Sequence, residues 1–105
     1  MKKNVISALL VAAAVGVMTV CPVGAEESQT YNVGICQLVQ HVALDAATEG
    51  FKDALTDKLG DAVTFDEQNA EGDSNTCSTI INSFVSNDVD LILANATPAL
   101  QAAAA

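Results

Sequence analysis

The sequence predicts an α/β fold in which a parallel sheet lies between two layers of helices. Three apolar runs, 32–39, 62–66 and 91–94, alternate with segments whose apolar residues recur at helical spacing. The first run is apolar enough to be buried on both faces, as strands of parallel sheets are. Strands that alternate with helices favour parallel pairing and right-handed crossovers. The predicted order is therefore β-α-β-α-β, followed by the start of a last helix.

The first strand, 32–39, leads into a helix that is predicted to stop at Gly60. Gly is common after the last helical residue because it adopts the left-handed backbone that terminates a helix. The helix itself is predicted from apolar residues three or four positions apart, which are Leu44, Ala47, Phe51, Ala54 and Leu55.

The second strand, 62–66, is followed by a polar loop, 67–73, that contains Gly72. Ser74 or Asn75 is predicted to cap the helix after this loop. The apolar stripe of that helix has the spacing i, i+3, i+4, i+7 and i+8, and consists of Cys77, Ile80, Ile81, Phe84 and Val85. The pattern indicates an amphipathic helix that covers one face of the sheet.

Residues 88–90 turn the chain into the third strand, 91–94, and a final helix follows. Thr97 is a suitable N-cap, and Pro98 suits the first helical position. Residues 99–105 favour helix, and neither Gly, a basic last turn nor Pro closes it. We therefore expect 26–105 to be part of a larger fold.

The first 25 residues resemble a secretory signal peptide. Lys2 and Lys3 precede an apolar run over 5–20, and small residues at 23–25 form a cleavage site. A retained anchor is less favoured because the run is shorter than the roughly 20 residues that span a bilayer. A third alternative is a lipoprotein that begins at a lipidated Cys21, although Val20 is large for that processing.

The chain is acidic, with a formal net charge of −9. Beyond residue 25 only Lys52 and Lys58 oppose the thirteen Asp and Glu. Such a surface repels nucleic acid and anionic membranes, so we expect no nucleic-acid partner. Cys36 and Cys77 are predicted to be unpaired core residues rather than a disulfide. A metal site is not expected, because the chain has one His and no C-x-x-C motif.

Polar residues gather after each predicted strand. Because ligands of parallel sheets bind outside the carboxyl ends of the strands, segments 37–44, 67–73 and 95–98 are predicted to form the site. They are rich in amides and hydroxyls: Gln37, Gln40, His41, Gln68, Asn69, Asp73, Asn95 and Thr97. The chain has no G-x-S-x-G, G-x-G-x-x-G or P-loop motif, which argues against a hydrolase or a nucleotide cofactor.

Two residues of this set have alternative interpretations. His41 can form a hydrogen-bonded or metal-binding pair with Asp45, or it can be a plain helix cap. Thr97 and the free N–H groups after it can hold a carboxylate, or Thr97 can cap the helix with no ligand.

Residues 33–41, 43–47 and 50–55 resemble the opening of ABC-transporter substrate-binding proteins, in the branch that includes tryptophan- and tyrosine-type binding proteins. Residues 68–73 and 90–103 match the second and third signatures of that branch. The resemblance covers 31–105 in order and with natural spacing.

This resemblance implies a type I periplasmic-binding-protein clamshell of two α/β lobes. Residues 26–105 would be an incomplete N-terminal lobe, so that the chain would be an N-terminal fragment. The cleft between the lobes would bind the ligand through Gln37, His41, Gln68, Asn69, Ala96 and Thr97. Two residues depart from the family pattern: Gln40 stands where an acidic residue is frequent, and Asn95 where an apolar one is common.

The function that the resemblance implies is capture of a small solute, with an aromatic-type amino acid as one candidate, and no catalysis. The partners would be the permease and ATPase of an ABC importer. The protein would be exported to the periplasm or the outer face of the cytoplasmic membrane, and would touch the membrane through the permease or a lipid anchor at Cys21. The alternatives are the effector-sensing domain of a regulator with this fold, and a small α/β enzyme with catalytic motifs elsewhere.

Overall fold

The computed structural model describes residues 29–105, so the predicted signal segment 1–25 lies outside the described part. The predicted order of strands and helices is confirmed, with a short 3-10 turn added between the first helix and the second strand. The elements are β1 (Tyr31–Gln37), α2 (Val42–Leu59), η3 (Gly60–Ala62), β2 (Val63–Asn69), α3 (Ser74–Ser86), β3 (Leu91–Asn95) and α4 (Thr97–Ala104). None of the helices formed by 29–105 is long and apolar enough to cross a lipid bilayer.

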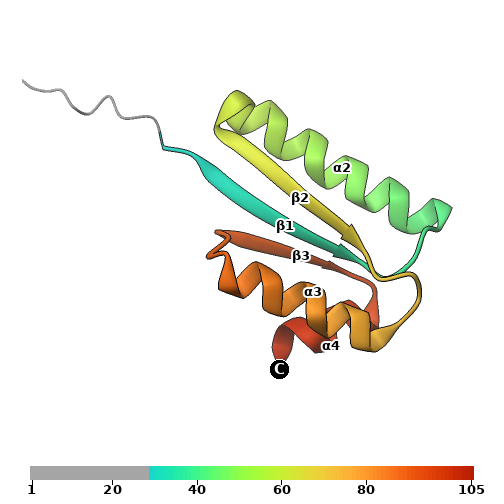
Figure 1. The fold of residues 1–105 in the computed structure, drawn as a ribbon. Coiled ribbons are helices and arrows are strands. Elements are labelled where there is room, and N and C mark those ends of the chain that lie inside the picture. Colours follow the sequence, from blue (N-terminus) through green and yellow to red (C-terminus); the bar gives the residue numbers. More distant parts are fainter. Residues whose placement is uncertain (1–28) are drawn as a thin grey trace, which may run out of the picture.

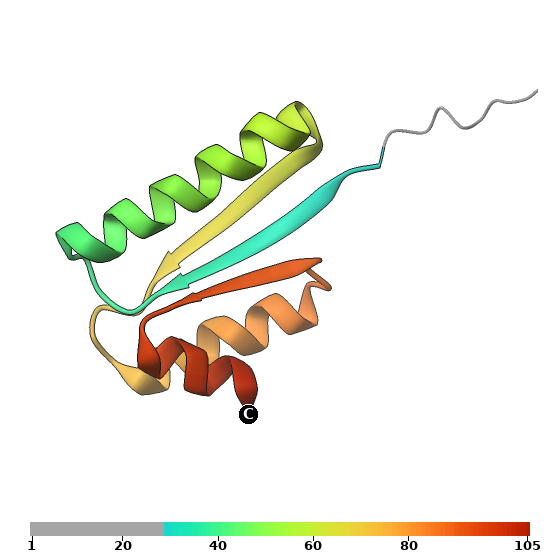
Figure 2. The same cartoon turned by 180° about the vertical axis from the view of Figure 1, so that it is seen from behind.

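The three strands form a parallel sheet in the order β2-β1-β3, with β1 in the centre. Figure 1 shows α2 on one face of this sheet and α3 with α4 on the other. The reverse view in Figure 2 shows the same three layers. The fold class predicted from the alternation of strands and helices is therefore confirmed.

The core on the α2 face joins Val33 and Ile35 of β1 and Val63 of β2 to one side of α2. Apolar residues of α2 pack against these strands, and Thr48 is the buried residue of the helix. Ala47 and Ala54, which belong to the spacing that predicted this helix, are exposed. Both lie about a quarter turn from the centre of the sheet-facing side. The sheet-facing row is Leu44, Thr48, Phe51, Leu55 and Leu59.

The core on the opposite face is built around α3. Phe84 is fully buried and lies against Gly34 of β1, where an added Cβ would sit 2.6 Å from the ring. Val85 is 62% exposed, so its predicted place in the buried stripe was wrong. It lies about a quarter turn from the centre of that stripe. The buried members of this core are Cys36, Ala70, Cys77, Ile80, Ile81, Phe84 and Ala99.

Several boundaries differ from the prediction. β2 continues to Asn69 instead of stopping at residue 66, because Glu67, Gln68 and Asn69 still pair with β1. The side chains at this end of the edge strand are exposed to solvent, so polar residues are tolerated there. β1 ends at Gln37, two residues earlier than predicted, and β3 extends to Asn95. Gly60 follows the last residue of α2 with a φ of 57°, as predicted.

A candidate ligand-binding site at the carboxyl edge of the sheet

The carboxyl ends of β1, β2 and β3 lie at one edge of the sheet, where α2, α3 and α4 begin (Figure 1). From the central strand β1 the chain passes to α2 on one face, and from β3 it passes to α4 on the other. Neighbouring strands whose connections leave on opposite faces create a crevice at their carboxyl ends. The fold therefore places the predicted loops together.

A row of three amide side chains crosses this edge. The strand register places Gln37 of β1 beside Asn69 of β2 on one side and Asn95 of β3 on the other. Gln37 is 5% exposed and Asn95 is 9% exposed, whereas Asn69 is open to solvent. The two buried amides at the ends of β1 and β3 need hydrogen bonds within the protein, because burying an unpaired polar group costs folding free energy.

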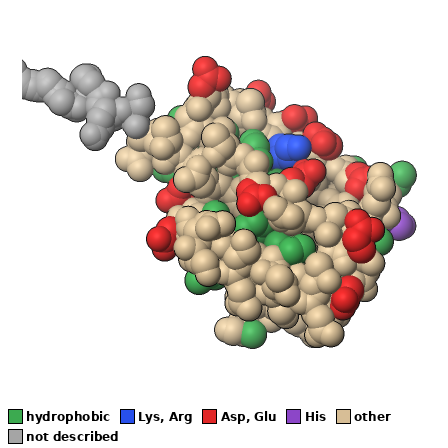
Figure 3. Space-filling view, viewed as in Figure 1, with side chains coloured by type: hydrophobic (Ala, Val, Ile, Leu, Met, Phe, Trp, Pro, Cys, Tyr) green, Lys and Arg blue, Asp and Glu red, His purple; other side chains and the backbone are tan. Residues whose placement is uncertain are grey.

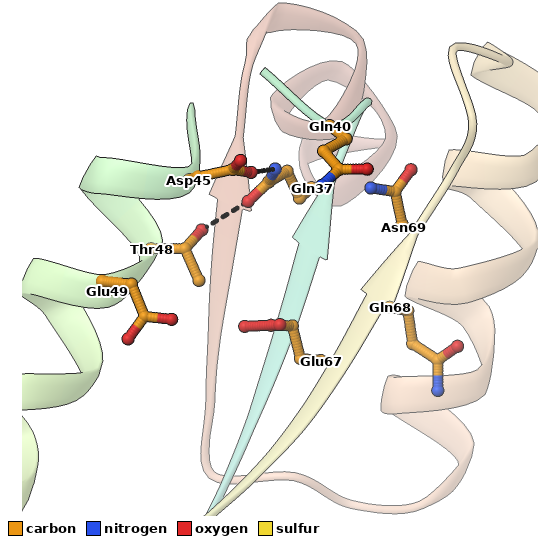
Figure 4. A pocket seen from close by; sticks show the side chains of 8 residues that line it. All are labelled: Gln37, Gln40, Asp45, Thr48, Glu49, Glu67, Gln68 and Asn69. Carbon is orange, nitrogen blue, oxygen red and sulfur yellow. Dashed lines mark hydrogen bonds between the residues drawn. The ribbon is translucent and has the colours of Figure 1, made fainter. Parts of the chain in front are cut away.

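Thr48 of α2 supplies part of those hydrogen bonds. Its hydroxyl donates to Gln37 Oε1 (2.7 Å) and accepts from Asn95 Nδ2 (2.9 Å). Gln37 Nε2 donates to Asp45 Oδ1 (2.7 Å) and to the Val39 carbonyl (2.9 Å). The Gln37 side chain lies between Asp45 and Thr48 in Figure 4. This amide network ties the start of α2 to the ends of β1 and β3.

The network changes how two sequence features are interpreted. Gln37, predicted as a ligand residue, already uses both amide hydrogens inside the protein. Asn95, an exception to the family pattern, donates to the Leu44 carbonyl (2.9 Å) as well as to Thr48. The sequence reasoning missed Thr48, although a Thr inside the apolar row of α2 was a signal that could have indicated a buried polar contact.

A polar cavity of about 330 Å³ lies beside the network, between α2 and the ends of β1 and β2. Figure 4 shows the Glu49 and Glu67 side chains reaching into it. Lys52 bridges these two carboxylates, at 3.8 Å from Glu49 and 3.3 Å from Glu67. The cavity is lined by Gln37, Gln40, Asp45, Thr48, Glu49, Glu67, Gln68 and Asn69. Three of the predicted site residues, Gln37, Gln68 and Asn69, are thus brought together.

The side chains of the two exposed residues of this group, Asn69 and Gln68, point in different directions. Asn69 Oδ1 accepts from the Glu71 N–H (2.7 Å), which shapes the turn before α3. The amide nitrogen of Asn69 points toward Gln40 in Figure 4. Gln68 points away from Gln37 and donates to Asp66 Oδ1 (2.6 Å). Of these two residues, Asn69 is therefore the one whose amide is turned toward another residue of the cavity lining.

His41 lies outside the cavity and caps α2. Its Nδ1 accepts from the Ala43 N–H (3.1 Å), and its backbone is extended. The side chain is exposed at the rim of the molecule, seen in purple in Figure 3. The Asp45 carboxylate accepts from Gln37, so the helix-cap interpretation of His41 is the one the structure supports. Within 29–105, no three His, Cys, Asp or Glu side chains are placed to hold a metal ion.

The start of α4 differs from the prediction by one residue. Ala96, with a φ of 99°, is the N-cap, and Thr97 is the first helical residue. The prediction that Thr97 caps the helix was therefore wrong, because the turn at Ala96 already brings Thr97 into helical geometry. No side-chain oxygen caps α4, whereas His41 caps α2 and Asp73 caps α3.

The uncapped start of α4 has a chemical consequence. The first helical bond runs from the Leu100 N–H to the Ala96 carbonyl (3.0 Å), which leaves the N–H groups of Thr97 and Ala99 without a helical acceptor. Pro98 has no N–H. The helix dipole makes this end partly positive, so a carboxylate is a favourable partner there.

Residues 32–105 match the protein-family model described as ABC transporter substrate binding protein. The chain belongs to this family. A tyrosine-binding protein of Clostridioides difficile (strain R20291) is 49% identical over 75 residues, which are 69% of this chain and 22% of that protein. The chain thus spans about a fifth of the length of that relative.

Solved structures agree with this assignment. A ligand-free, open substrate-binding protein with adhesive properties from Clostridium difficile superposes with a TM-score of 0.67 and 43% identity, over 70% of this chain and 26% of that one. An ABC domain in complex with L-Trp from Streptococcus pneumoniae gives a TM-score of 0.68 and 35% identity, over 72% and 26%. The relatives are substrate-binding proteins, which are not enzymes. The resemblance to periplasmic-binding-protein domains is confirmed.

Proposed function

We propose that this substrate-binding protein captures an amino acid with an aromatic side chain for an ABC importer and has no catalytic activity of its own. The similarity to the tyrosine-binding protein of Clostridioides difficile carries this proposal. The similarity to a domain solved with L-Trp supports the same class of solute. Permease and ATPase subunits would be the partners.

The geometry of the carboxyl edge supports an amino-acid ligand. The uncapped start of α4 offers N–H groups to an α-carboxylate, and the exposed Thr97 hydroxyl lies next to them. Asn69, Gln68 and His41 are exposed on the same edge and would add polar contacts. Gln37 would act by holding α2 and β1 in place, because its own donors are already used.

The expected mechanism is closure of two lobes around the ligand. A solute that contacts both lobes stabilises the closed form over the open one, which shifts the population toward the form a permease would recognise. In this scheme residues 1–25 direct export, or Cys21 carries a lipid anchor, and residues 26–105 contribute to the N-terminal lobe. The protein would act outside the cytoplasmic membrane.

A chimera tests the proposal. Residues 32–105 would replace the matching part of the Clostridioides difficile tyrosine-binding protein, and calorimetry would measure binding of tyrosine, tryptophan, alanine and glutamate. We expect the chimera to bind tyrosine or tryptophan more tightly than the other two. A chimera that unfolds cooperatively, and is therefore folded, but binds none of them would refute the proposal. Preference for glutamate or alanine would refute the aromatic class alone.

A further inference from the structure

The two edges of the sheet present different kinds of residue. β2 forms one edge, and its outer half is polar and charged, with Asp66, Glu67 and Gln68 exposed. β3 forms the other edge, and Leu91–Asn95 carry no charge. Charged side chains on an edge strand discourage the addition of another strand, whereas an apolar edge strand favours it. β3 is therefore the edge at which this sheet can be extended.

β3 has the composition of a strand that is buried on both faces, but it is not buried to that extent. Leu91 is 49% exposed, and Ile92 and Leu93 are only partly buried. Val33 and Ile35 of the central strand β1, which are equally apolar, are fully buried. β3 pairs with β1 on one side, and no other strand formed by 29–105 pairs with its outer side. The N–H and C=O groups on that side are therefore open to a further strand.

α4 presents a second apolar surface that the rest of 29–105 leaves exposed. Its Ala99 is buried in the core around α3, and Ala102 packs against the same core. Leu100 is 59% exposed, and Ala103 and Ala104 are exposed as well. These three residues have the spacing i, i+3 and i+4, so they form a row on one face of the helix. β3 and α4 thus each keep one apolar side without a covering layer.

The handedness of the connections indicates where a strand that followed α4 would lie. α2 leads the chain from β1 to β2 over one face of the sheet, and α3 leads it back past β1 to β3 over the other (Figures 1 and 2). Right-handed crossovers over opposite faces run in opposite directions across a sheet, as these two do. α4 lies on the same face as α3, so a right-handed crossover over α4 leads further away from β1. Its end point is the open edge of β3.

We propose that the open edge of β3 and the exposed row of α4 dock a polypeptide that adds a parallel, apolar strand beside β3. The remainder of a substrate-binding protein of this family supplies that strand, even when it is a separate chain. This chain spans about a fifth of the length of the tyrosine-binding relative, so most of the family fold is available as the partner. A second copy is disfavoured, because two chains with a formal net charge of −9 repel each other. The inference does not depend on the proposed ligand.

The test refolds the full chain together with the Clostridioides difficile tyrosine-binding protein from which the segment matching this chain has been deleted. Sedimentation equilibrium measures the mass of the product, and hydrogen exchange measures the protection of each strand. We expect a one-to-one complex in which exchange slows over 91–95 and is unchanged over 63–69. A dimer of this chain, protection over 63–69 instead, or no complex after refolding together would overturn the proposal.

Substitutions at the two sheet edges sharpen the test. Leu91→Lys places a charge at the open edge of β3, and Leu100→Lys places one on the exposed row of α4. Each variant competes with an equal amount of isotope-labelled parent chain for a limited amount of the partner. We expect each variant to be about tenfold or more weaker, the loss that corresponds to leaving one Leu side chain unburied. Two variants that compete as well as the parent would overturn the proposal.

Thr64→Lys is the matched control, because it adds the same charge at an exposed position of β2, on the opposite edge. This variant should compete as well as the parent chain. Urea denaturation of each variant shows whether it is folded. Equal weakening by Thr64→Lys and Leu91→Lys would mean that added charge, and not the β3 edge, determines the association, and would also overturn the proposal.

Discussion

At the scale of single residues, two glycines show how strongly the effect of an added Cβ on stability depends on its surroundings. Gly34 lies under Phe84, and an added Cβ would come within 2.6–2.8 Å of three ring atoms. We predict that Gly34→Ala lowers the free energy of unfolding by about 1–3 kcal/mol, because the ring or the strand must move in a packed core. Urea denaturation followed by circular dichroism measures the change.

Gly50→Ala is the matched control for that substitution. Gly50 lies within α2 and has nothing within 4 Å of the position of an added Cβ. Ala favours helix over Gly, so this variant should gain about 0.5–1 kcal/mol. A loss at Gly50 comparable to the loss at Gly34 would show that the contact with Phe84 is not the cause.

Thr48 is the residue on which the amide network depends. Thr48→Val keeps the shape of the side chain but removes the hydroxyl that contacts both Gln37 and Asn95. We expect a loss of about 1–3 kcal/mol in unfolding free energy, because a buried amide oxygen and a buried amide hydrogen lose partners. Thr56→Val, at an exposed position of the same helix, should stay within about 0.5 kcal/mol of the parent. Equal effects at the two positions would argue against the network.

Single-residue contacts were also where the sequence was least informative. Glutamine after a strand suggests a ligand contact, but whether its amide is free depends on a residue eleven positions later. Gln37 and Thr48 meet only because α2 folds back over β1. Burial itself was easier to predict, since Cys36 and Cys77 were each expected in the core and both are fully buried there.

At the scale of elements, helix starts show which local signals decide a boundary. Asp73, and not Ser74 or Asn75, caps α3: its Oδ1 accepts from the Asn75 N–H (2.9 Å) and its Oδ2 from the Thr76 hydroxyl (3.2 Å). Asp73→Ala should reduce the free energy of unfolding by about 1 kcal/mol. Asp73→Asn retains a side-chain oxygen and should lose only a small part of this. If Asn costs as much as Ala in urea denaturation, the cap is not the cause.

Strand ends were predicted less well than strand centres for a physical reason. Apolar runs mark where a strand is buried, so β1 and β3 were located by their centres. The end of β2 is polar and carries no such mark, although residues 67–69 pair with β1 as part of the strand. That difference affects the site, because Gln68 and Asn69 lie on a strand rather than in a loop.

At the scale of the whole molecule, the order and parallel pairing of the elements followed from the alternation of apolar runs and helical periods. The position of each strand in the sheet did not follow from that alternation. The order β2-β1-β3 depends on which face of the sheet each connecting helix covers. That order puts the ends of β1 and β3 side by side, with α2 and α4 leaving on opposite faces. The candidate site is therefore a property of the topology, and the individual loop sequences supply its polar groups.

Net charge is the other property of the whole molecule. Acidic side chains are spread over the face in Figure 3, and beyond residue 25 Lys52 and Lys58 alone oppose them. Raising sodium chloride from about 0.01 M to about 1 M shortens the screening length from about 30 Å to about 3 Å and should raise the urea midpoint, because repulsion in the folded chain weakens. Asp53→Asn with Asp57→Asn, both exposed on α2, should flatten this rise. A midpoint that falls with salt, or an equal rise in the variant, would contradict the argument.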